Sequence, residues 1–482
     1  MTLPRVRTRN RYSEVTPSTA PALHVVTFGC QMNKYDSLLV EGRFRAAGYR
    51  LTEEVSTADV VLFNTCSVRD HAEERVYSWL GEIQRVKAER PDLVVGMMGC
   101  MAQRAQGDIF SRARHVDIVC GTRRIQDLPE LVEDLRQRRR APECPSQGER
   151  VLAVEMDGDV ALDRSGEPWG GGLTSYLTVM RGCDLNCTFC IVPTVRGRVR
   201  SRPIAELVGE ASWMVAGGAK VLTLLGQTVN AYGEDLSRPG AGEKHLRGRQ
   251  GRPGLADLLY ELQEIDGLER IRLITLHPSY VTTALARAIG DCDKVDRFLP
   301  LPAQSGSDDC LRRMKRGYTT ELYRRRVELL RREVPDIELG SDWIVGFPGE
   351  TEDEFDETLS FAEEIEFAQG YVFQYDPRPG TRAHERVDDV PRAVKKERNQ
   401  RLLKAVEAVA LNRMGRWVGR EVKVFVEEVG KAAGTLRART HHNLPVRLPG
   451  DTAWIGSERS VRIDAASPYG LTGRVPDSKA SR

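Results

Sequence analysis

The sequence predicts an α/β protein in three parts: an N-terminal doubly wound parallel sheet, a longer central β/α repeat and a small C-terminal all-β barrel. From residue 22 to about residue 412, short apolar runs alternate with longer segments of 3.6-residue periodicity, which is typical of parallel strands covered by helices. From residue 421 the pattern changes to period two, which is typical of antiparallel strands. A chain of 482 residues with 40% hydrophobic content has room for two to four domains.

The first part follows a polar, basic, proline-bearing stretch, residues 1–21, which we expect to be a disordered tail. Each expected strand is a short apolar run and each helix a longer periodic segment. The strands are expected at 22–28, 58–64, 93–98 and 116–119, and helices at 34–47, 68–89 and 128–139. A run rich in Arg and Pro then ends this domain, 22–142, and opens a linker, 143–172.

The central part, 173–412, repeats the strand–helix alternation. Its strands are expected at 176–180, 220–225, 270–276, 297–301, 339–345 and 370–375, with helices that include 203–216, 320–333 and 353–366. Six strands are too few for a closed eight-stranded barrel, although the repeat is similar to one. A Gly-, Pro- and Arg-rich stretch, 234–254, is expected to be a surface insertion.

The C-terminal part, 413–472, is expected to be a small β-barrel followed by a tail, 473–482. Its strands are expected at 421–427, 434–439, 444–448 and 460–463. From residue 413 to the end there are 13 Lys and Arg against 7 Asp and Glu, whereas the whole chain has a net charge of only +2. A basic module on a slightly acidic body fits a domain that binds a polyanion, although a merely basic surface fits equally well.

No stretch is apolar enough for a signal peptide or for a membrane span of about 20 residues. We therefore expect a cytoplasmic protein without a membrane partner. Ten cysteines in such a chain are expected to be thiols rather than disulfides.

Three of these cysteines occupy equivalent positions in the first domain. Cys30, Cys66 and Cys100 each come just after an expected strand and before the next helix. Because the carboxyl ends of parallel strands share one edge of a sheet, the three thiols are expected to converge there, beside helix N-termini. The alternative is three ordinary buried cysteines. Cys120 also ends a strand, and with Cys144, Cys292 and Cys310 we interpret it as structural.

A second cysteine group, Cys183, Cys187 and Cys190, has C-x3-C-x2-C spacing in a loop after the first central strand. Protein iron–sulfur clusters normally take four cysteine ligands, so a loop with three leaves one iron open. A zinc site is the alternative, but the next Cys is Cys292 and the next His is His245. The loop lies where a β/α barrel has its active site.

The C-x3-C-x2-C loop resembles the signature of the radical S-adenosylmethionine (SAM) family. The resemblance implies a partial (β/α)6 barrel and a 4Fe–4S cluster whose open iron chelates the amino and carboxylate groups of SAM. It also implies that an electron from the cluster cleaves SAM to a 5′-deoxyadenosyl radical.

Nearly the whole chain resembles the methylthiotransferases of this family. The similar motifs are Gly29-Cys-Gln-Met-Asn33, Asn64-Thr-Cys-Ser-Val-Arg69, Gly99-Cys-Met-Ala-Gln-Arg104 and Leu225-Gly-Gln-Thr-Val-Asn230. The resemblance implies two 4Fe–4S clusters, with Cys30, Cys66 and Cys100 holding an auxiliary one. The first motif is similar to that of enzymes acting at C2 of N6-isopentenyladenosine 37 in tRNA, and the C-terminal part is similar to the RNA-binding TRAM domain.

Residues at the other strand ends are candidate SAM contacts. Phe189 lies between two cluster ligands and is placed to cover the adenine, or simply to pack. The remaining candidates are Gln227, Gln304, Ser305 and Asp342, the last in a strand that resembles the family's adenine-binding strand. Each of these four has an alternative role as a turn or capping residue.

Arginines near the cluster loop and in the C-terminal part are candidate RNA contacts. Arg196, Arg198, Arg200 and Arg202 follow the loop, where they are suited to bind phosphates or to neutralise SAM or the cluster. In the basic module the candidates are Arg437, Arg439 and Arg447.

The expected partners are a tRNA anticodon loop, a low-potential electron donor and an iron–sulfur or sulfur delivery protein. Two other functions remain open. One is the same chemistry on a ribosomal-protein aspartate or on threonylcarbamoyladenosine in tRNA, and the other is a non-catalytic iron–sulfur carrier.

Overall fold

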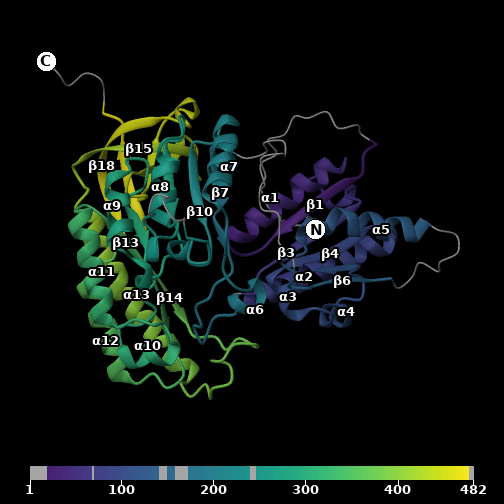
Figure 1. The fold of residues 1–482 in the computed structure, drawn as a ribbon, viewed down its shortest axis with the longest axis horizontal. Coiled ribbons are helices and arrows are strands. Elements are labelled where there is room, and N and C mark those ends of the chain that lie inside the picture. The colour runs from purple at the N-terminus through teal and green to yellow at the C-terminus, as the bar shows by residue number, and fades with distance from the viewer. Residues whose placement is uncertain (1–18, 68–69, 141–148, 158–171, 239–245, 477–482) are drawn as a thin grey trace. The chain divides into compact units, whose positions relative to one another are not determined.

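The computed structural model describes residues 19–67, 70–140, 149–157, 172–238 and 246–476. The chain divides into two compact units (Figure 1). The first unit contains Met1–Gly172 together with Arg181–Cys183 and Ile191–Arg198. The second contains Leu173–Met180, Asp184–Cys190 and Val199–Arg482.

Within the described residues, the first unit is built on a six-stranded sheet with the order β2-β1-β3-β4-β5-β6, in which every neighbouring pair is parallel. The strands are β1 Ala22–Thr27, β2 Arg50–Leu51, β3 Val60–Thr65, β4 Val94–Gly99, β5 Ile118–Cys120 and β6 Val151–Ala153. The four expected strands are confirmed. The two edge strands β2 and β6 are new, since they are too short for a periodic pattern, and β6 lies in the stretch predicted to be linker.

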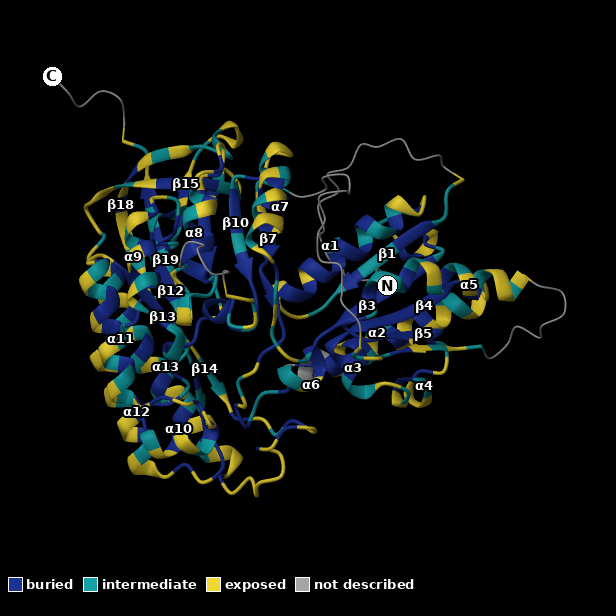
Figure 2. Cartoon of the chain, viewed as in Figure 1, coloured by how far each residue is buried: buried dark blue, intermediate teal, exposed yellow. Residues whose placement is uncertain are grey.

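Helices cover both faces of this sheet, as the doubly wound prediction requires. They are α1 Gln31–Ala46, α2 Asp70–Glu89, α3 Cys100–Ala105, α4 Asp108–Arg112 and α5 Leu128–Arg140. Alternate residues of β3 face opposite cores: Val60 and Leu62 pack with residues of α1 and α5, and Val61 and Phe63 with residues of α2 and α3. Strands buried on both faces read as continuous apolar runs, and Figure 2 shows them as the buried centre of the unit.

In the described part of the second unit, six parallel strands form two three-stranded sheets, β7-β10-β11 and β12-β13-β14. An isolated parallel bridge joins Ile271 of β11 to Val295, three residues before β12. The strands are β7 Thr174–Thr178, β10 Val221–Leu225, β11 Arg270–Leu273, β12 Phe298–Pro300, β13 Glu338–Val345 and β14 Gln369–Gln374. The helices are α7 Ile204–Ala216, α8 Leu255–Gln263, α9 Thr283–Asp291, α10 Asp308–Met314, α11 Thr320–Glu333 and α12 Glu352–Ile365. The six expected strands and the three expected helices are all present, and α11 has the predicted bounds.

A long helix, α13 Arg392–Gly415, leads into a closed barrel of strands in the order β15-β16-β17-β19-β18. The strands are β15 Glu421–Val429, β16 Thr435–Thr440, β17 Pro445–Pro449, β18 Glu458–Ser467 and β19 Gly470–Arg474. Strand β19 was not predicted, because two glycines among its five residues weaken the strand pattern. It extends the barrel past the predicted boundary at residue 472.

Ion pairs and hydrogen bonds attach this barrel to the β/α repeat of the same unit. Arg272 on β11 pairs with Asp296 at 2.9 Å and with Glu427 on β15. His441, after β16, has its Nε2 at 3.0 Å from the carbonyl oxygen of Val295. The barrel is therefore seated on the repeat through buried polar contacts. Among the described helices, none has the length and apolar composition that crossing a membrane requires.

Candidate functional site

The structure places the three strand-end cysteines of the first unit as the sequence predicted. Cys30 is the residue before α1, Cys66 follows β3, and Cys100 is the first residue of α3. The strands that lead to them, β1, β3 and β4, are adjacent in the sheet, and Thr27 pairs with Asn64 as Thr65 pairs with Gly99. The three residues therefore lie at one edge of the sheet.

The loops that carry Cys30 and Cys66 are held in close contact. Gly29 has φ +103°, and a Cβ added there would lie 2.4 Å from Cβ of Cys66 and 2.9 Å from its Sγ. The side-chain amide of Asn33 donates to the carbonyls of Phe28 and Thr65 at 2.8 and 3.0 Å. Only glycine fits this position, so the close approach of the two cysteine loops depends on Gly29.

A buried arginine lies beside two of these thiols. Arg196, in the short helix α6 Val192–Arg196, donates to Asp36 Oδ2 at 2.9 Å and to Asn33 Oδ1 at 3.0 Å. Burial alone lowers the pKa of Arg196, but the nearby Asp36, Cys100 and Cys30 raise it above its usual value. Burial raises the pKa of the Cys100 thiol, and Arg196 acts in the opposite direction. The guanidinium is thus placed to stabilise negative charge on the sulfurs.

The C-x3-C-x2-C loop runs between β8 Met180–Arg181 and α6. Cys183 and Cys187 are buried and Cys190 is half-buried. Within the second unit, Thr188 fixes the loop: its N–H donates to Met314 at 2.9 Å, and its carbonyl accepts from Ala383 at 2.8 Å.

Arg316, which the sequence argument did not single out, donates from Nη1 to Cys187 Sγ at 3.3 Å. Burial alone lowers the pKa of Arg316, but Tyr318 and Cys187 raise it above its usual value. No motif or local pattern marks this residue, because it reaches the loop from a distant segment.

The donor chemistry of both cysteine groups fits an iron–sulfur cluster, because each group offers three thiols. Among the described residues, no group of three or more His, Cys, Asp or Glu side chains is arranged to hold a single metal ion. A 4Fe–4S cluster instead takes each thiolate on a different iron, so its ligands stand further apart. The nine described cysteines are all outside disulfides, as ligands must be, and Cys144 lies outside the described residues.

The predicted SAM contacts differ in how the structure uses them. Gln227, after β10, has a buried Oε1 without a hydrogen-bond partner in the described part of the chain. Gln304 has φ +69°, and its backbone makes two hydrogen bonds to β13. Its N–H donates to the carbonyl of Asp342, and its carbonyl accepts from the N–H of Ile344. Asp342 itself is half-buried on β13. Gln227 therefore remains the best-placed ligand candidate of these three.

Ser305 and Phe189 are engaged with the protein. Ser305 is fully buried, and its hydroxyl contacts Thr358 Oγ1 at 3.2 Å and accepts from the N–H of Ser307. This is the turn role that the sequence left as its alternative. Phe189 packs beside an apolar cluster that includes Cys310 and Phe347, in agreement with a packing role.

A buried carboxylate at the end of β13 was not among the predicted site residues. Glu350 accepts from the N–H of Gly346 at 2.6 Å and from Arg398 at 3.0 Å. Burial raises its pKa, and Gly346 and Arg398 oppose this. The carboxylate fixes the turn after β13, at the edge where the other strand ends of the repeat lie. The Gly-Phe-Pro-Gly-Glu motif was the available signal.

The structure separates the four arginines that follow the loop. Arg196 and Arg202 are buried in ion pairs, Arg196 with Asp36 and Arg202 with Glu210, whereas Arg198 and Arg200 are exposed. The prediction that all four bind phosphates is therefore corrected for Arg196 and Arg202, since their guanidiniums are committed inside the protein.

The barrel arginines also differ from one another. Arg447 is exposed on β17, and Arg437 is paired with Glu428 at the surface. Arg439 is only partly exposed and donates to the carbonyl of Asn443 at 2.8 Å. Arg447 and Arg437 are thus the accessible candidates of this set.

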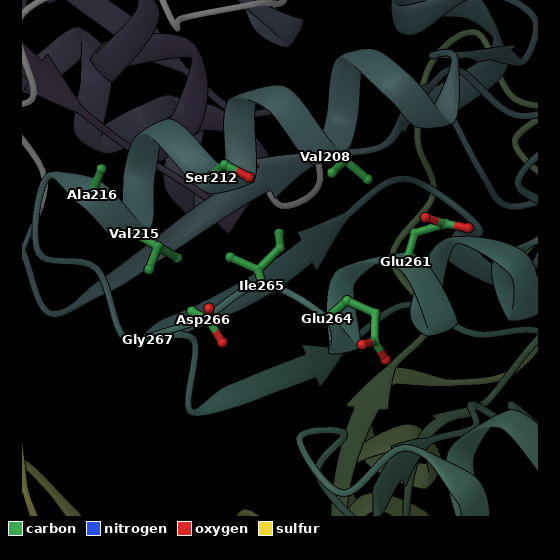
Figure 3. Close-up of a pocket in the computed structure, with 9 residues that line it drawn as sticks. All are labelled: Val208, Ser212, Val215, Ala216, Glu261, Glu264, Ile265, Asp266 and Gly267. Atoms are coloured by element: carbon green, nitrogen blue, oxygen red, sulfur yellow. The ribbon is translucent and has the colours of Figure 1, made fainter.

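A surface hollow of about 580 Å³ between α7 and α8 lies away from these residues (Figure 3). Val208, Val215 and Ile265 form its apolar lining, and acidic side chains that include Glu261 and Glu264 lie at its rim. It adjoins the turn before β11, so it is at the opposite end of the strands from the cysteine loop. None of the predicted site residues lines it.

Three protein-family models match the chain. The Uncharacterized protein family UPF0004 matches residues 22–121, the Radical SAM superfamily residues 177–362 and the TRAM domain residues 415–475. Curated relatives named tRNA-2-methylthio-N(6)-dimethylallyladenosine synthase match nearly the full length. The relative from Geobacter metallireducens is 41% identical, covering 94% of this chain and 98% of its own length. A relative from Thermus thermophilus is 38% identical, covering 96% and 94%.

Solved structures share the fold at low identity. The radical SAM methyltransferase TsrM from Kitasatospora setae, with cobalamin and a [4Fe-4S] cluster bound, has a TM-score of 0.54 at 13% identity, covering 87% of this chain and 80% of that chain. The apo form of the cobalamin-dependent radical enzyme OxsB has a TM-score of 0.51 at 15% identity, covering 80% and 56%. These likenesses support the fold alone.

The β/α repeat, its three-cysteine loop and the matching family model define a radical SAM enzyme, for which the family implies a 4Fe–4S cluster and SAM. The chain belongs to the radical SAM methylthiotransferase family that contains the tRNA-2-methylthio-N(6)-dimethylallyladenosine synthases.

Proposed function

We propose that this enzyme converts N6-isopentenyladenosine at position 37 of tRNA to its 2-methylthio derivative, using SAM and two 4Fe–4S clusters. The main support for this proposal is the similarity, over at least 94% of the chain, to relatives whose name states this product. The three thiols at the ends of β1, β3 and β4 support the second cluster.

The target carbon is an aromatic C–H without useful acidity, so a general base has no proton to remove and a radical route is needed. When bound, a 4Fe–4S cluster with an open iron supplies the electron that cleaves SAM and so provides the radical. Cys183, Cys187 and Cys190 hold this cluster in our proposal. The auxiliary cluster, held by Cys30, Cys66 and Cys100, takes part in sulfur delivery.

We assign the remaining tasks by position. Residues 22–142 provide the auxiliary site, residues 173–412 the SAM site, and residues 413–472 an RNA-binding barrel. The Oε1 of Gln227 accepts a hydrogen bond from SAM, because this buried acceptor has no protein donor among the described residues. Adenosine 37 lies in a single-stranded loop, from which a base can be turned into a pocket. The exposed Arg198, Arg200 and Arg447 contact the RNA backbone.

The reaction also needs partners of defined chemistry. Reductive cleavage of SAM requires a low-potential electron donor, and repeated turnover requires new sulfur. An iron–sulfur or sulfur delivery protein therefore serves the auxiliary site in this proposal.

Iron and sulfide measurement tests the two-cluster assignment. The reconstituted wild-type chain is expected to hold about eight irons, and each triple variant, Cys30/Cys66/Cys100→Ala or Cys183/Cys187/Cys190→Ala, about four. If one triple variant lost all of its iron, or if neither variant lost any, the result would contradict two separate cluster sites.

Nucleoside analysis tests the substrate. Deletion of the gene should remove 2-methylthio-N6-isopentenyladenosine and leave N6-isopentenyladenosine, and the wild-type gene should restore it with methyl label from SAM. Loss of a methylthio group from threonylcarbamoyladenosine or from a ribosomal protein would instead support the alternative substrates. Absence of 5′-deoxyadenosine in the presence of SAM and reductant would support a non-catalytic carrier.

A further inference from the structure

Arg316 is a buried cation that points at a cluster cysteine. It lies two residues after α10 and is 7% exposed. Its guanidinium has three neighbours: Nη1 donates to Cys187 Sγ at 3.3 Å, Nη2 to the carbonyl of Pro302 at 3.1 Å, and Nε to Tyr318 Oη at 3.3 Å. All of these residues belong to the second unit.

The charge of Arg316 has no carboxylate beside it. Among the ion pairs of the described residues none involves Arg316, whereas the other arginines of this unit with comparable burial each have an acidic partner. Those arginines are Arg202, Arg270, Arg272, Arg378 and Arg398. A buried cation without a counter-charge is unfavourable, because burial removes its hydration and no opposite charge replaces it. Among the buried arginines of the described second unit, only Arg316 lacks a carboxylate partner, and it faces a cysteine sulfur.

The surroundings of the guanidinium are neutral apart from that sulfur. Tyr318 donates its hydroxyl to the carbonyl of Ala303 at 2.6 Å, and its ring packs edge-on against His277. Burial, and then the charge of Arg316, lowers the pKa of His277 to about 2, so this imidazole adds no charge. Burial raises the pKa of the Tyr318 phenol, so Cys187 is the contact of Arg316 that is negatively charged when it binds iron.

We propose that Arg316 is a positioning residue for the cluster at Cys183, Cys187 and Cys190: its guanidinium hydrogen-bonds the Cys187 sulfur and balances the negative charge of the cluster. The inference rests on the proposed function, because it requires those cysteines to bind a cluster. Net charge and hydrogen bonds to the sulfurs set the reduction potential of such clusters. Since reduction adds a negative charge, Arg316 stabilises the reduced state and raises the potential.

The test uses the full chain with Cys30, Cys66 and Cys100 replaced by Ala, so that a single cluster is titrated. In this background, Arg316→Met, Arg316→Lys and the control Arg312→Met are reconstituted with iron and sulfide. Arg312 is 74% exposed on α10 and pairs with Asp309. Redox titration followed by electron paramagnetic resonance should show a more negative potential for Arg316→Met and a smaller shift for Arg316→Lys. Arg312→Met should leave the potential unchanged. The inference would be overturned if Arg316→Met bound the full amount of iron and its cluster had the same reduction potential as the background protein.

Unfolding of the metal-free protein separates this role from a structural one. Met replaces an unbalanced buried cation, so metal-free Arg316→Met should be at least as stable as the background protein while losing its cluster faster. A less stable metal-free protein with an unchanged potential would show a purely structural arginine and overturn the inference. If Arg316→Met is insoluble, Arg316→Gln carries the same expectation for the potential. Failure of the proposed function is a separate result, seen as iron that remains bound when Cys183/Cys187/Cys190→Ala is added to the Cys30/Cys66/Cys100→Ala background.

Discussion

Asp36 and Arg196 form a buried ion pair between residues 160 positions apart, with Asp36 Oδ2 at 2.9 Å from Arg196 Nη2. Asp36 is fully buried and also accepts from Arg181, so one carboxylate balances two guanidiniums. Both arginines flank the cluster loop in the sequence but belong to the same compact unit as α1. The N-terminal sheet edge and the segments on either side of the loop thus share a single counter-charge.

Asp36→Asn should strongly destabilise the first unit. The substitution keeps the shape and leaves Arg181 and Arg196 buried without a carboxylate, which costs about 3–5 kcal/mol for a broken buried pair. Urea denaturation of the metal-free chain measures the change. Glu53→Gln, at an exposed position, is the matched control and should stay within about 0.5 kcal/mol of wild type. Equal stability of the two variants would contradict the counter-charge role.

Gly29→Ala should remove the proposed auxiliary cluster without changing any of its three proposed cysteine ligands. The new Cβ would lie 2.9 Å from Cys66 Sγ, so the two cysteine loops have to separate. Gly48→Ala is a close control, because Gly48 also has a positive φ, +85°, but nothing lies within 4 Å of its added Cβ. We expect about half the iron in Gly29→Ala and full iron in Gly48→Ala. Similar iron contents would mean that this close contact is not required.

The sequence was informative where topology alone decides position. Cys30, Cys66 and Cys100 could be placed at one edge because parallel strands with right-handed crossovers leave little choice. Their supporting residues were not predictable in the same way. Asn33 and Arg196 act through partners that are distant in the sequence, and no local pattern identifies such partners.

The arginines after the cluster loop show the same limit. A run of Arg in a loop favours an exposed surface, yet Arg196 and Arg202 are buried because Asp36 and Glu210 meet them inside the protein. Burial of a charge depends on the partner, which the sequence does not reveal. The edge strands β2 and β6 could not be predicted for a different reason: a strand of two or three residues is too short to show a periodic pattern.

Gln227→Met should weaken SAM binding without destabilising the protein. The buried Oε1 of Gln227 has no hydrogen-bond partner in the described part of the chain, so an apolar replacement removes an unsatisfied acceptor. The metal-free variant should be as stable as wild type or more stable, by up to about 1 kcal/mol. SAM affinity of the cluster-loaded protein, measured by calorimetric titration, should fall about tenfold through loss of one hydrogen bond to a charged ligand. If the affinity of the Gln227→Met variant for SAM were unchanged, Gln227 would not be a SAM ligand.

His441 should make the attachment of the barrel sensitive to acid. Its Nε2 contacts the carbonyl of Val295 at 3.0 Å, and burial, followed by the charges of Arg270, His442 and Arg297, lowers its pKa from 6.5 to about 4. As the pH falls below 6.5, the unfolded chain binds the proton before the folded protein does. The contribution of His441 to the free energy of unfolding is therefore fully present above pH 6.5, where the imidazole is neutral in both states. This contribution is lost progressively as the pH falls from 6.5 to 4.

The measurement compares the free energy of unfolding at pH 7.5 and pH 5 for wild type and His441→Gln, since the amide of Gln also donates to Val295. The variant should lose about 1–2 kcal/mol less on acidification, because it has no imidazole to protonate. Taking the difference between the two proteins removes pH effects that both share, including those of the cluster ligands. His384→Gln, at an exposed position, should follow wild type. Parallel pH dependences for His441→Gln and wild type would show that His441 is not the group that titrates at this interface.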